Sequence, residues 1–277
     1  MQKINYPLIV SDFDGTLVNA DGSISETNKQ AIAQYVAAGG HFAISTGRMP
    51  AGILSRVREL GLKGLVSCCQ GAIIADIDSE EVILDGRIPF ETTLTVVKKM
   101  EEMGLHIHVY DLWEYYCNMK DEALKIYERA VKSKATLILD RKMSDFVQEK
   151  RLCSYKILAM VPAEDNERIL NALTAENFTG CGVTRSSEYL VEVVNTKYSK
   201  GTAIAFLADH FGISIDKTVA VGDQQNDLPM VEKAGMGIAV QNADVGLKEK
   251  AAYICARSHE EGAIAEVIEK FGFYNEG

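Results

Sequence analysis

Apolar and polar positions along the first 83 residues predict strands that alternate with helices. Leu8, Ile9 and Val10 form a continuous apolar run, as is typical of a strand that is covered on both faces. Further patterns predict helices over residues 26–38 and 50–60, and strands over residues 41–45 and 64–69. This alternation predicts parallel strand pairing with right-handed crossovers.

The pattern changes after about residue 82 and returns near residue 199. In between we expect helices over 92–103, 121–131 and 164–173, and strands over 105–110, 113–119, 155–161, 182–185 and 189–194. The short gap between the first two of these strands predicts a hairpin, whereas residues 132–150 fit no clear pattern. After residue 199 we expect helices over 200–211, 228–233 and 260–271, and strands over 218–221, 237–240 and 253–255.

The change of pattern predicts two domains. We expect an α/β, Rossmann-like parallel-sheet core formed by residues 1–83 and 191–277. The intervening residues 84–190 mix hairpin-like strands with helices, so we expect them to form an inserted α+β domain.

The charge and the cysteines limit the partners and the compartment. The 277-residue chain has a formal net charge of -10, which argues against binding to nucleic acid or to an anionic membrane but permits a small anionic substrate. We expect a monomer or a weak homo-oligomer. The six cysteines show no zinc-binding spacing, and the first apolar run is too short for a signal peptide or a membrane span. Free thiols in a reducing cytoplasm are therefore the simplest interpretation.

The first polar cluster, Asp12-Phe13-Asp14-Gly15-Thr16, follows the predicted strand at residues 8–10. Residues two apart in an extended segment point the same way, so Asp12 and Asp14 can face one point. Two neighbouring carboxylates need a cation or a shared proton between them, and Mg²⁺ suits a site that also holds phosphate. An Asx-rich turn is the alternative, and a DxD sequence alone would not exclude it.

Two further clusters stand at predicted helix starts. Thr46 and the Gly47 amide, in Ser45-Thr46-Gly47-Arg48, offer a phosphate cradle, although an ordinary helix cap would look the same. Lys200, in Ser199-Lys200-Gly201-Thr202, is electrostatically misplaced at a helix start unless it points at a bound phosphate. The alternative for Lys200 is a solvated surface lysine.

The fourth cluster follows the apolar run Val219-Ala220-Val221. Asp223 at the strand end and Asp227 one helical turn later can approach the same cation, and Asn226 can donate to phosphate. A capped helix with an acidic first turn would explain Asp227 but not the whole cluster. The four clusters together offer a nucleophile, a proton shuttle, a metal site and a phosphate cradle, which is what phosphoryl transfer requires.

With these four motifs in this order, the chain resembles the haloacid dehalogenase-like phosphatases, and within them the Cof-type sugar-phosphate phosphatases with a type IIB cap. The resemblance covers essentially the whole length. It implies that Asp12 is the nucleophile, that Asp14 is the general acid/base, and that residues 84–190 are a cap that closes over the site and selects the substrate. It also implies Mg²⁺ held by Asp12, Asp223 and the Asp14 carbonyl, with Asp227 nearby. Thr46, Gly47, Lys200 and Asn226 would hold the phosphate.

Some positions depart from the resemblance or lie outside it. Cys69-Gln70-Gly71-Ala72 has Gln70 where the family typically shows Asn, so the reach of this side chain differs. We expect Arg48, Gln70, Arg185 and Glu192 to contact the substrate. His106 and His108 share one face of a predicted strand, but no third ligand is evident, so we expect an ordinary half-exposed sheet rather than a metal pair.

The expected function is Mg²⁺-dependent hydrolysis of a small phosphorylated metabolite, such as a sugar phosphate, through an aspartyl-phosphate. One alternative is a phosphotransferase or phosphomutase, which passes the phosphoryl group to a hydroxyl group instead of water. A second is a metal-dependent glycosyltransferase, which would leave Lys200 without a role. A third is a non-catalytic protein that binds a phosphorylated metabolite, although binding alone needs no nucleophile.

Overall fold

The structure is a computed structural model that describes residues 3–131 and 133–274, and these form two compact units. The core unit comprises the chain up to Gly47, Leu54–Leu84 and the chain from Tyr198 onward. The inserted unit comprises Arg48–Ile53 and Asp85–Lys197. The expected second boundary, at residues 190/191, falls within a strand of the inserted unit, Leu190–Asn195.

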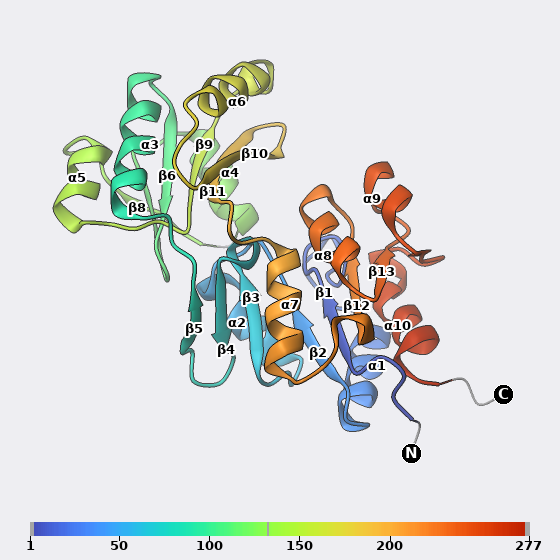
Figure 1. The fold of residues 1–277 in the computed structure, drawn as a ribbon. Helices are drawn as coiled ribbons and strands as arrows, with labels where there is room; N and C mark the ends of the chain where they lie inside the picture. The colour runs from blue at the N-terminus through green and yellow to red at the C-terminus, as the bar shows by residue number, and fades with distance from the viewer. Residues whose placement is uncertain (1–2, 132, 275–277) are drawn as a thin grey trace. The chain divides into compact units, whose positions relative to one another are not determined.

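The core unit is built on a five-stranded parallel sheet in which β1 lies between β12 and β2 (Figure 1). The strand order is β14-β13-β12-β1-β2. The strands are β1 Leu8–Ser11, β2 His41–Ile44, β12 Thr218–Gly222, β13 Met236–Ala239 and β14 Tyr253–Ile254. Every residue of β1 and β12 is buried, because apolar side chains on both strand faces pack against other elements.

A separate three-stranded sheet, β3-β4-β5, adjoins this parallel sheet. Its strands are β3 Leu65–Cys68, β4 Ile73–Asp76 and β5 Val82–Asp85. The expected parallel arrangement of β3 is seen at a parallel Ser45–Ser67 bridge to β2, but β3 also pairs antiparallel with β4, which was not expected. The physical reason is the turn Cys69–Gly71, whose three residues all have positive φ and reverse the chain.

Helices connect the parallel strands of the core unit. They are α1 Glu26–Ala37, α2 Pro50–Glu59, α7 Lys200–His210, α8 Leu228–Lys233, α9 Val245–Lys250 and α10 Ala263–Val267, and α10 continues as a π-helical turn over Ile268–Gly272. The side chain of Ser25 caps α1 by accepting from the Asn28 N–H. The first turn of α2 belongs to the inserted unit by its contacts.

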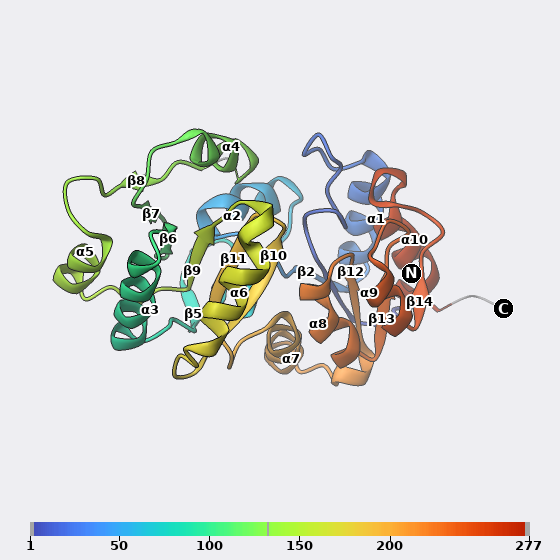
Figure 2. The ribbon, with the colours of Figure 1, turned by 90° about the horizontal axis from the view of Figure 1, so that it is seen from above.

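The inserted unit contains a six-stranded sheet in the order β10-β11-β9-β6-β7-β8, in which only β7 and β8 pair in parallel among the pairings described. The strands are β6 His106–Tyr110, β7 Tyr115–Cys117, β8 Thr136–Leu137, β9 Lys156–Met160, β10 Cys181–Ser187 and β11 Leu190–Asn195. The helices are α3 Phe90–Glu102, α4 Glu122–Val131, α5 Met143–Lys150 and α6 Asn166–Ala175. Figure 2 shows α6 against β10 and β11.

The two faces of this sheet differ in chemistry. One face packs against α3, α5 and α6 through an apolar core that includes Ile107, Val109, Ile157, Val191 and Val193. Strand residues alternate between faces, so the residues between these point to the opposite face. That opposite face carries the buried polar side chains of His106, His108, Lys156 and Glu192.

Five of the helices and strands described were not expected from the sequence: β4, β5, β8, α5 and α9. The stretch that fitted no clear pattern contains β8 and α5, and its first residue, 132, lies outside the described residues. All six cysteines are free thiols. Within the part of the chain that the structure describes, no helix combines the length and apolar character needed to cross a membrane.

Candidate active site

Two buried carboxylates lie side by side because β1 and β12 are neighbouring parallel strands. Ser11 is in register with Val221, so Asp12 and Asp223 both emerge at the carboxyl edge of the sheet. The Asp12 N–H donates to the Val221 carbonyl at 2.9 Å, which extends the strand pairing as far as Asp12. Asp12 and Asp223 are only 6% and 4% exposed.

Lys200, the first residue of α7, bonds to two of the buried carboxylates at this end of the sheet. The Ser199 side chain and Thr202 form a capping box, which fixes the first turn of the helix. The Lys200 side chain is fully buried, and its Nζ donates to Asp12 Oδ1 at 2.5 Å and to Asp227 Oδ1 at 2.6 Å. The position of this lysine at a helix start is therefore explained by its two buried anionic partners.

Asp227 is held from two sides and is completely buried. Its Oδ2 accepts the backbone N–H groups of Asp223 at 2.9 Å and Gln224 at 3.0 Å, while Oδ1 accepts Lys200. These bonds fix the loop after β12, and so they also fix the position of Asp223.

The donor set fits a divalent cation with oxygen ligands. Carboxylate oxygens of Asp12, Asp223 and Asp227 all lie within 4.8 Å of one another. Three carboxylates against the one ammonium of Lys200 leave a local charge of 1 − 3 = −2. Carboxylates this close repel one another unless a proton or a cation lies between them. A hard divalent cation satisfies the same oxygens.

The pKa values follow from this crowding. Burial raises the pKa of Asp12 well above its usual range, and the nearby Asp227 raises it further, while Lys200 offsets part of the rise. Burial also raises the pKa of Asp223, against a hydrogen bond from Thr16 that lowers it. Burial alone would lower the pKa of Lys200, but Asp12 and Asp227 outweigh it and raise that pKa.

Three of the predicted phosphate-binding residues, Thr46, Gly47 and Asn226, are connected through contacts of Gln70. Thr46 is buried beyond β2, and its carbonyl accepts the Gln70 N–H at 3.0 Å. The Gln70 side chain lies over Gly47, where a Cβ would come within 2.6 Å of Gln70 Nε2. Gln70 Oε1 in turn accepts Asn226 Nδ2 at 3.1 Å. Gln70 thus joins the Thr46–Gly47 segment to Asn226.

A close backbone contact connects the turn that carries Gln70 to the start of α7. Gly71 has φ +95°, and a Cβ there would lie 2.2 Å from the Ser199 carbonyl oxygen. Only glycine fits this conformation and this approach. The turn that carries Gln70 therefore packs directly against the residue that precedes Lys200.

The remaining predicted residues are placed differently. Asp14 has an exposed side chain and pairs with Val18 through an isolated backbone bridge. Arg48, Arg185 and Glu192 belong to the inserted unit. Arg185 is in register with Val191, whereas Glu192 is in register with Thr184, so their side chains point to opposite faces of the sheet and share no surface. Glu192 is buried and accepts from Lys156 and from Ser186, both at 3.0 Å.

Sequence reasoning missed three residues that shape the site. Thr16 Oγ1 donates to Asp223 Oδ1 at 2.8 Å, and Asn242 Nδ2 donates to the Gly15 carbonyl at 2.8 Å. Gly15 has φ +76°, and a Cβ there would lie 2.5 Å from Asp223 Oδ2. The signal for Asn242 was available, because it follows the apolar strand β13 at the same edge of the sheet.

Comparisons with known proteins agree with this arrangement. The profile of a family described as haloacid dehalogenase-like hydrolase matches residues 9–268. A Haemophilus influenzae protein with a provisional phosphatase name is 29% identical over 96% of this chain and 98% of its own. A 5-amino-6-(5-phospho-D-ribitylamino)uracil phosphatase of Bacillus subtilis is 25% identical over 95% of this chain and 96% of its own.

Solved structures support the fold. The crystal structure of a haloacid dehalogenase-like hydrolase from Bacteroides thetaiotaomicron aligns with a TM-score of 0.84 and 28% identity, covering 96% of this chain and 99% of its own. A sugar phosphatase of HAD subclass IIB aligns with a TM-score of 0.81 and 22% identity, over 96% of this chain and 98% of its own. The second match bears on the fold alone. The Rossmann-like core with an inserted α+β unit is therefore confirmed.

Proposed function

The chain belongs to the haloacid dehalogenase-like hydrolases, and on that premise we propose that it hydrolyses a small phosphorylated metabolite, with Mg²⁺, through an aspartyl-phosphate on Asp12. Its relatives are named phosphatases, and hydrolases of this family use a divalent metal. What we propose beyond the family is that the metal is Mg²⁺, that the intermediate is an aspartyl-phosphate, and that the residues have the roles given below.

The observation that carries the proposal is the double contact of Lys200 with Asp12 and Asp227. A buried lysine between two carboxylates at a sheet edge is costly to build for a purely structural purpose. It has a clear purpose if a phosphate dianion arrives there, because the ammonium then screens the phosphate from the attacking carboxylate.

The metal would be held by Asp12, Asp223 and the backbone carbonyl of Asp14, with Asp227 nearby. When bound, it neutralises negative charge on the transferring phosphoryl group. An Asp12 carboxylate oxygen attacks phosphorus, and the bond from phosphorus to the ester oxygen breaks. Lys200 holds Asp12 Oδ1 and so orients the carboxylate for this attack.

Asp14 is the proposed proton carrier. Its carboxylic acid gives a proton to the departing ester oxygen, and its carboxylate then takes a proton from the water that attacks the aspartyl-phosphate. That second attack breaks the bond between phosphorus and Asp12 and restores the carboxylate. The exposed side chain of Asp14 suits an exchange of protons with substrate and water, in contrast to the buried Asp12.

Thr46, the Gly47 amide, Lys200 and Asn226 would bind the phosphoryl oxygens. The contact between Gln70 and Asn226 supports this assignment, since it holds the Asn226 amide beside the Thr46–Gly47 segment. We assign substrate selection to the inserted domain and catalysis to the core, with the boundaries expected from the sequence (84–190 against 1–83 and 191–277) except that the chain as far as Lys197 packs with the inserted unit. Arg48, Gln70, Arg185 and Glu192 remain the proposed substrate contacts, with Arg185 and Glu192 on different faces of their sheet.

We further propose a sugar phosphate or similar metabolite as the substrate, a cytoplasmic location and a monomeric or weakly oligomeric state. The free state of all six thiols suits a reducing compartment. The phosphate released by the named Bacillus subtilis relative comes from a phosphorylated small molecule, which suits the same class of substrate here.

The test is a screen of phosphorylated metabolites for release of inorganic phosphate, with and without Mg²⁺, in wild type and in Asp12→Asn. We expect Mg²⁺-dependent release from at least one ester and none from the variant. Transfer of the phosphoryl group to an added sugar hydroxyl, without release to water, would instead identify a phosphotransferase. Ligand binding without turnover of any ester would identify a binding protein.

A further inference from the structure

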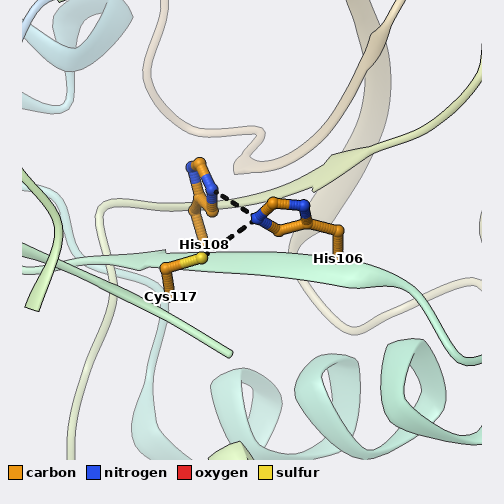
Figure 3. A group of neighbouring side chains, drawn as sticks. All are labelled: His106, His108 and Cys117. Atoms are coloured by element: carbon orange, nitrogen blue, oxygen red, sulfur yellow. Dashed lines mark hydrogen bonds between the residues drawn. The ribbon is translucent and has the colours of Figure 1, made fainter. Parts of the chain in front are cut away.

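A second cluster of metal-binding side chains lies in the inserted unit, on the polar face of its sheet. Strands β6 and β7 pair antiparallel with His108 in register with Cys117, so these two side chains project from the same face at directly opposite positions. His106 lies two residues earlier on β6 and points the same way. Figure 3 shows the two rings and the thiol converging. The expectation that these histidines have no third partner is therefore wrong, because strand pairing supplies Cys117.

The ligand atoms of the cluster are nearly as far apart as those around one metal ion. His106 Nε2 lies 3.0 Å from Cys117 Sγ and 3.2 Å from His108 Nε2, and all three ligand atoms lie within 4.8 Å of one another. In a tetrahedral zinc site, bond lengths near 2.0–2.1 Å to nitrogen and 2.3 Å to sulfur place ligand atoms about 3.3 Å (N to N) and about 3.6 Å (N to S) apart. One ion can bind all three atoms after small side-chain adjustments.

A carboxylate orients one of the two histidines toward the cluster. Asp121 Oδ2 lies 3.0 Å from His106 Nδ1, so Nδ1 carries the proton and the Nε2 lone pair faces the cluster. A carboxylate on the outer nitrogen is the usual support of a metal-binding histidine. His108 makes its hydrogen-bond contact through Nε2 alone, since its Nδ1 has no partner among the described residues.

Burial favours the neutral form of both imidazole rings. His106 is 6% exposed and His108 is fully buried, which corrects the expectation of a half-exposed sheet. Burial lowers the pKa of His106, against a smaller opposing effect of Asp121, and it lowers the pKa of His108 well below its usual value. Neutral imidazole is the form that binds metal. Burial raises the pKa of the Cys117 thiol to about 11, so an ion must displace its proton.

An ion can reach the cluster from within the same unit. A cavity of about 990 Å³ is lined by His106 and Asp121 together with Met119, Tyr127 and Met160. Asp121 is 44% exposed, so the carboxylate next to His106 is in contact with solvent. The cavity provides the entry path that a buried metal site needs.

We propose that His106, His108 and Cys117 form a binding site for a borderline-soft transition-metal ion, and that zinc is the ion that fits it best. Two imidazole nitrogens and one thiolate suit zinc, whereas Mg²⁺ prefers oxygen ligands. The site is therefore chemically distinct from the carboxylate cluster of the core unit and does not rest on the proposed phosphatase activity. A bound ion would link β6 to β7. Through the contact between His106 and Asp121, it would also link these strands to the segment that leads into α4.

The test uses cobalt as a visible substitute for zinc in the full-length, metal-stripped protein. Cobalt bound to a thiolate produces a sulfur-to-metal charge-transfer band in the near ultraviolet, which a site made of carboxylates cannot produce. We expect this band in wild type and its loss on titration with zinc. It should also persist in Asp12→Asn, because that change affects only the core unit.

Variants assign the band to the three residues. Cys117→Ser should remove it, and His108→Gln should weaken cobalt binding by at least about 100-fold, whereas Cys181→Ser, which changes a cysteine of the same unit outside the cluster, should leave it intact. Asp121→Asn should weaken binding by about 10- to 100-fold without removing a ligand, and it decides the matter if Cys117→Ser fails to fold. Absence of the band in wild type, its persistence in Cys117→Ser, or unchanged affinity in Asp121→Asn would overturn the proposal.

Discussion

The ammonium group of Lys200 lies 2.5 Å from Oδ1 of Asp12, although 188 positions separate the two residues in the chain. The same ammonium group lies 2.6 Å from Asp227, so one buried cation serves two buried carboxylates. Asp223 adds a third carboxylate that Lys200 does not contact directly among the bonds described. The excess of three buried carboxylates over one ammonium group determines how the site should respond to substitution, to pH and to an added metal ion.

Asp12→Asn should abolish turnover and yet leave the metal-free protein at least as stable as wild type. Loss of the nucleophile is expected to lower kcat by at least about 10³-fold. Stability should hold because the substitution removes one of the crowded carboxylates, while Lys200 keeps its contact with Asp227. Phosphate release and thermal unfolding in the presence of a chelator measure the two effects. Turnover close to the wild-type rate would exclude Asp12 as the nucleophile.

Lys200→Met should have the opposite effect on stability. It leaves Asp12 and the fully buried Asp227 without their shared cation, and an uncompensated buried charge costs about 3–5 kcal/mol of unfolding free energy. Denaturant unfolding measures the loss, and Lys29→Met, at an exposed helix position, is the control. Added Mg²⁺ should restore part of the stability, because a cation at the carboxylates replaces some of the lost charge. A stability loss no larger than that of the control would contradict this account.

Gly15→Ala should impair the site through both the backbone and Asp223. A residue other than glycine is strained at φ +76°, and the new Cβ would lie 2.5 Å from Asp223 Oδ2. We expect a loss of about 1–3 kcal/mol in stability together with weaker Mg²⁺-dependent turnover. Gly61→Ala is a matched control, because Gly61 has φ +69° and nothing within 4 Å of its Cβ position. If both variants lose stability but neither loses activity, then Gly15 has no role in placing Asp223.

The stability of the metal-free protein should carry a pH dependence from Asp12 and Asp223. The pKa values of both are raised in the folded protein, chiefly by burial, so between the ordinary value of about 3.9 and the raised values the folded state binds more protons than the unfolded state. Their contribution to the free energy of unfolding is complete below about pH 3.9 and is lost as pH rises through the raised values.

The double variant Asp12→Asn/Asp223→Asn isolates this contribution from that of other carboxylates. We expect the unfolding free energy of the variant, relative to wild type, to increase as pH rises above about 3.9 and through the raised pKa values of the two carboxyl groups when no metal is present. Saturating Mg²⁺ should abolish the increase, since the ion stabilises the ionised wild-type carboxylates. A difference that does not change with pH would show that these groups ionise normally in the folded chain.

The parallel sheet, and the position of the site at the carboxyl ends of its strands, could be predicted because short stretches of sequence indicate them. The run Leu8-Ile9-Val10 is apolar at every position, as burial of both strand faces requires, and Asp12 follows within two residues. Lys200 was recognisable because a lysine at a helix start opposes the helix dipole. The short strands β4 and β5 were missed, although Ile73-Ile74-Ala75 and Val82-Ile83-Leu84 are apolar runs of the same kind.

Strand register could not be read from the sequence, and two arrangements in the inserted unit depend on it. Arg185 and Glu192 lie close together in the chain but on opposite faces, because register pairs them with Val191 and Thr184. His106 and His108 seemed to lack a third ligand, because Cys117 becomes their neighbour only through the pairing of β6 with β7. In both cases the deciding contact is between strands, and no spacing within one strand encodes it.

The place of β1 between β2 and β12 has a consequence for biosynthesis. Leu8 pairs with Thr218, so the strand that carries Asp12 lacks one of its two neighbours until more than three quarters of the chain has left the ribosome. All strands of the inserted unit are made before that point and can pair while β1 waits. The catalytic edge is therefore among the last parts of the molecule to assemble, and a nascent chain arrested before β12 would expose an apolar strand with an open edge, the feature that chaperones bind and that drives aggregation.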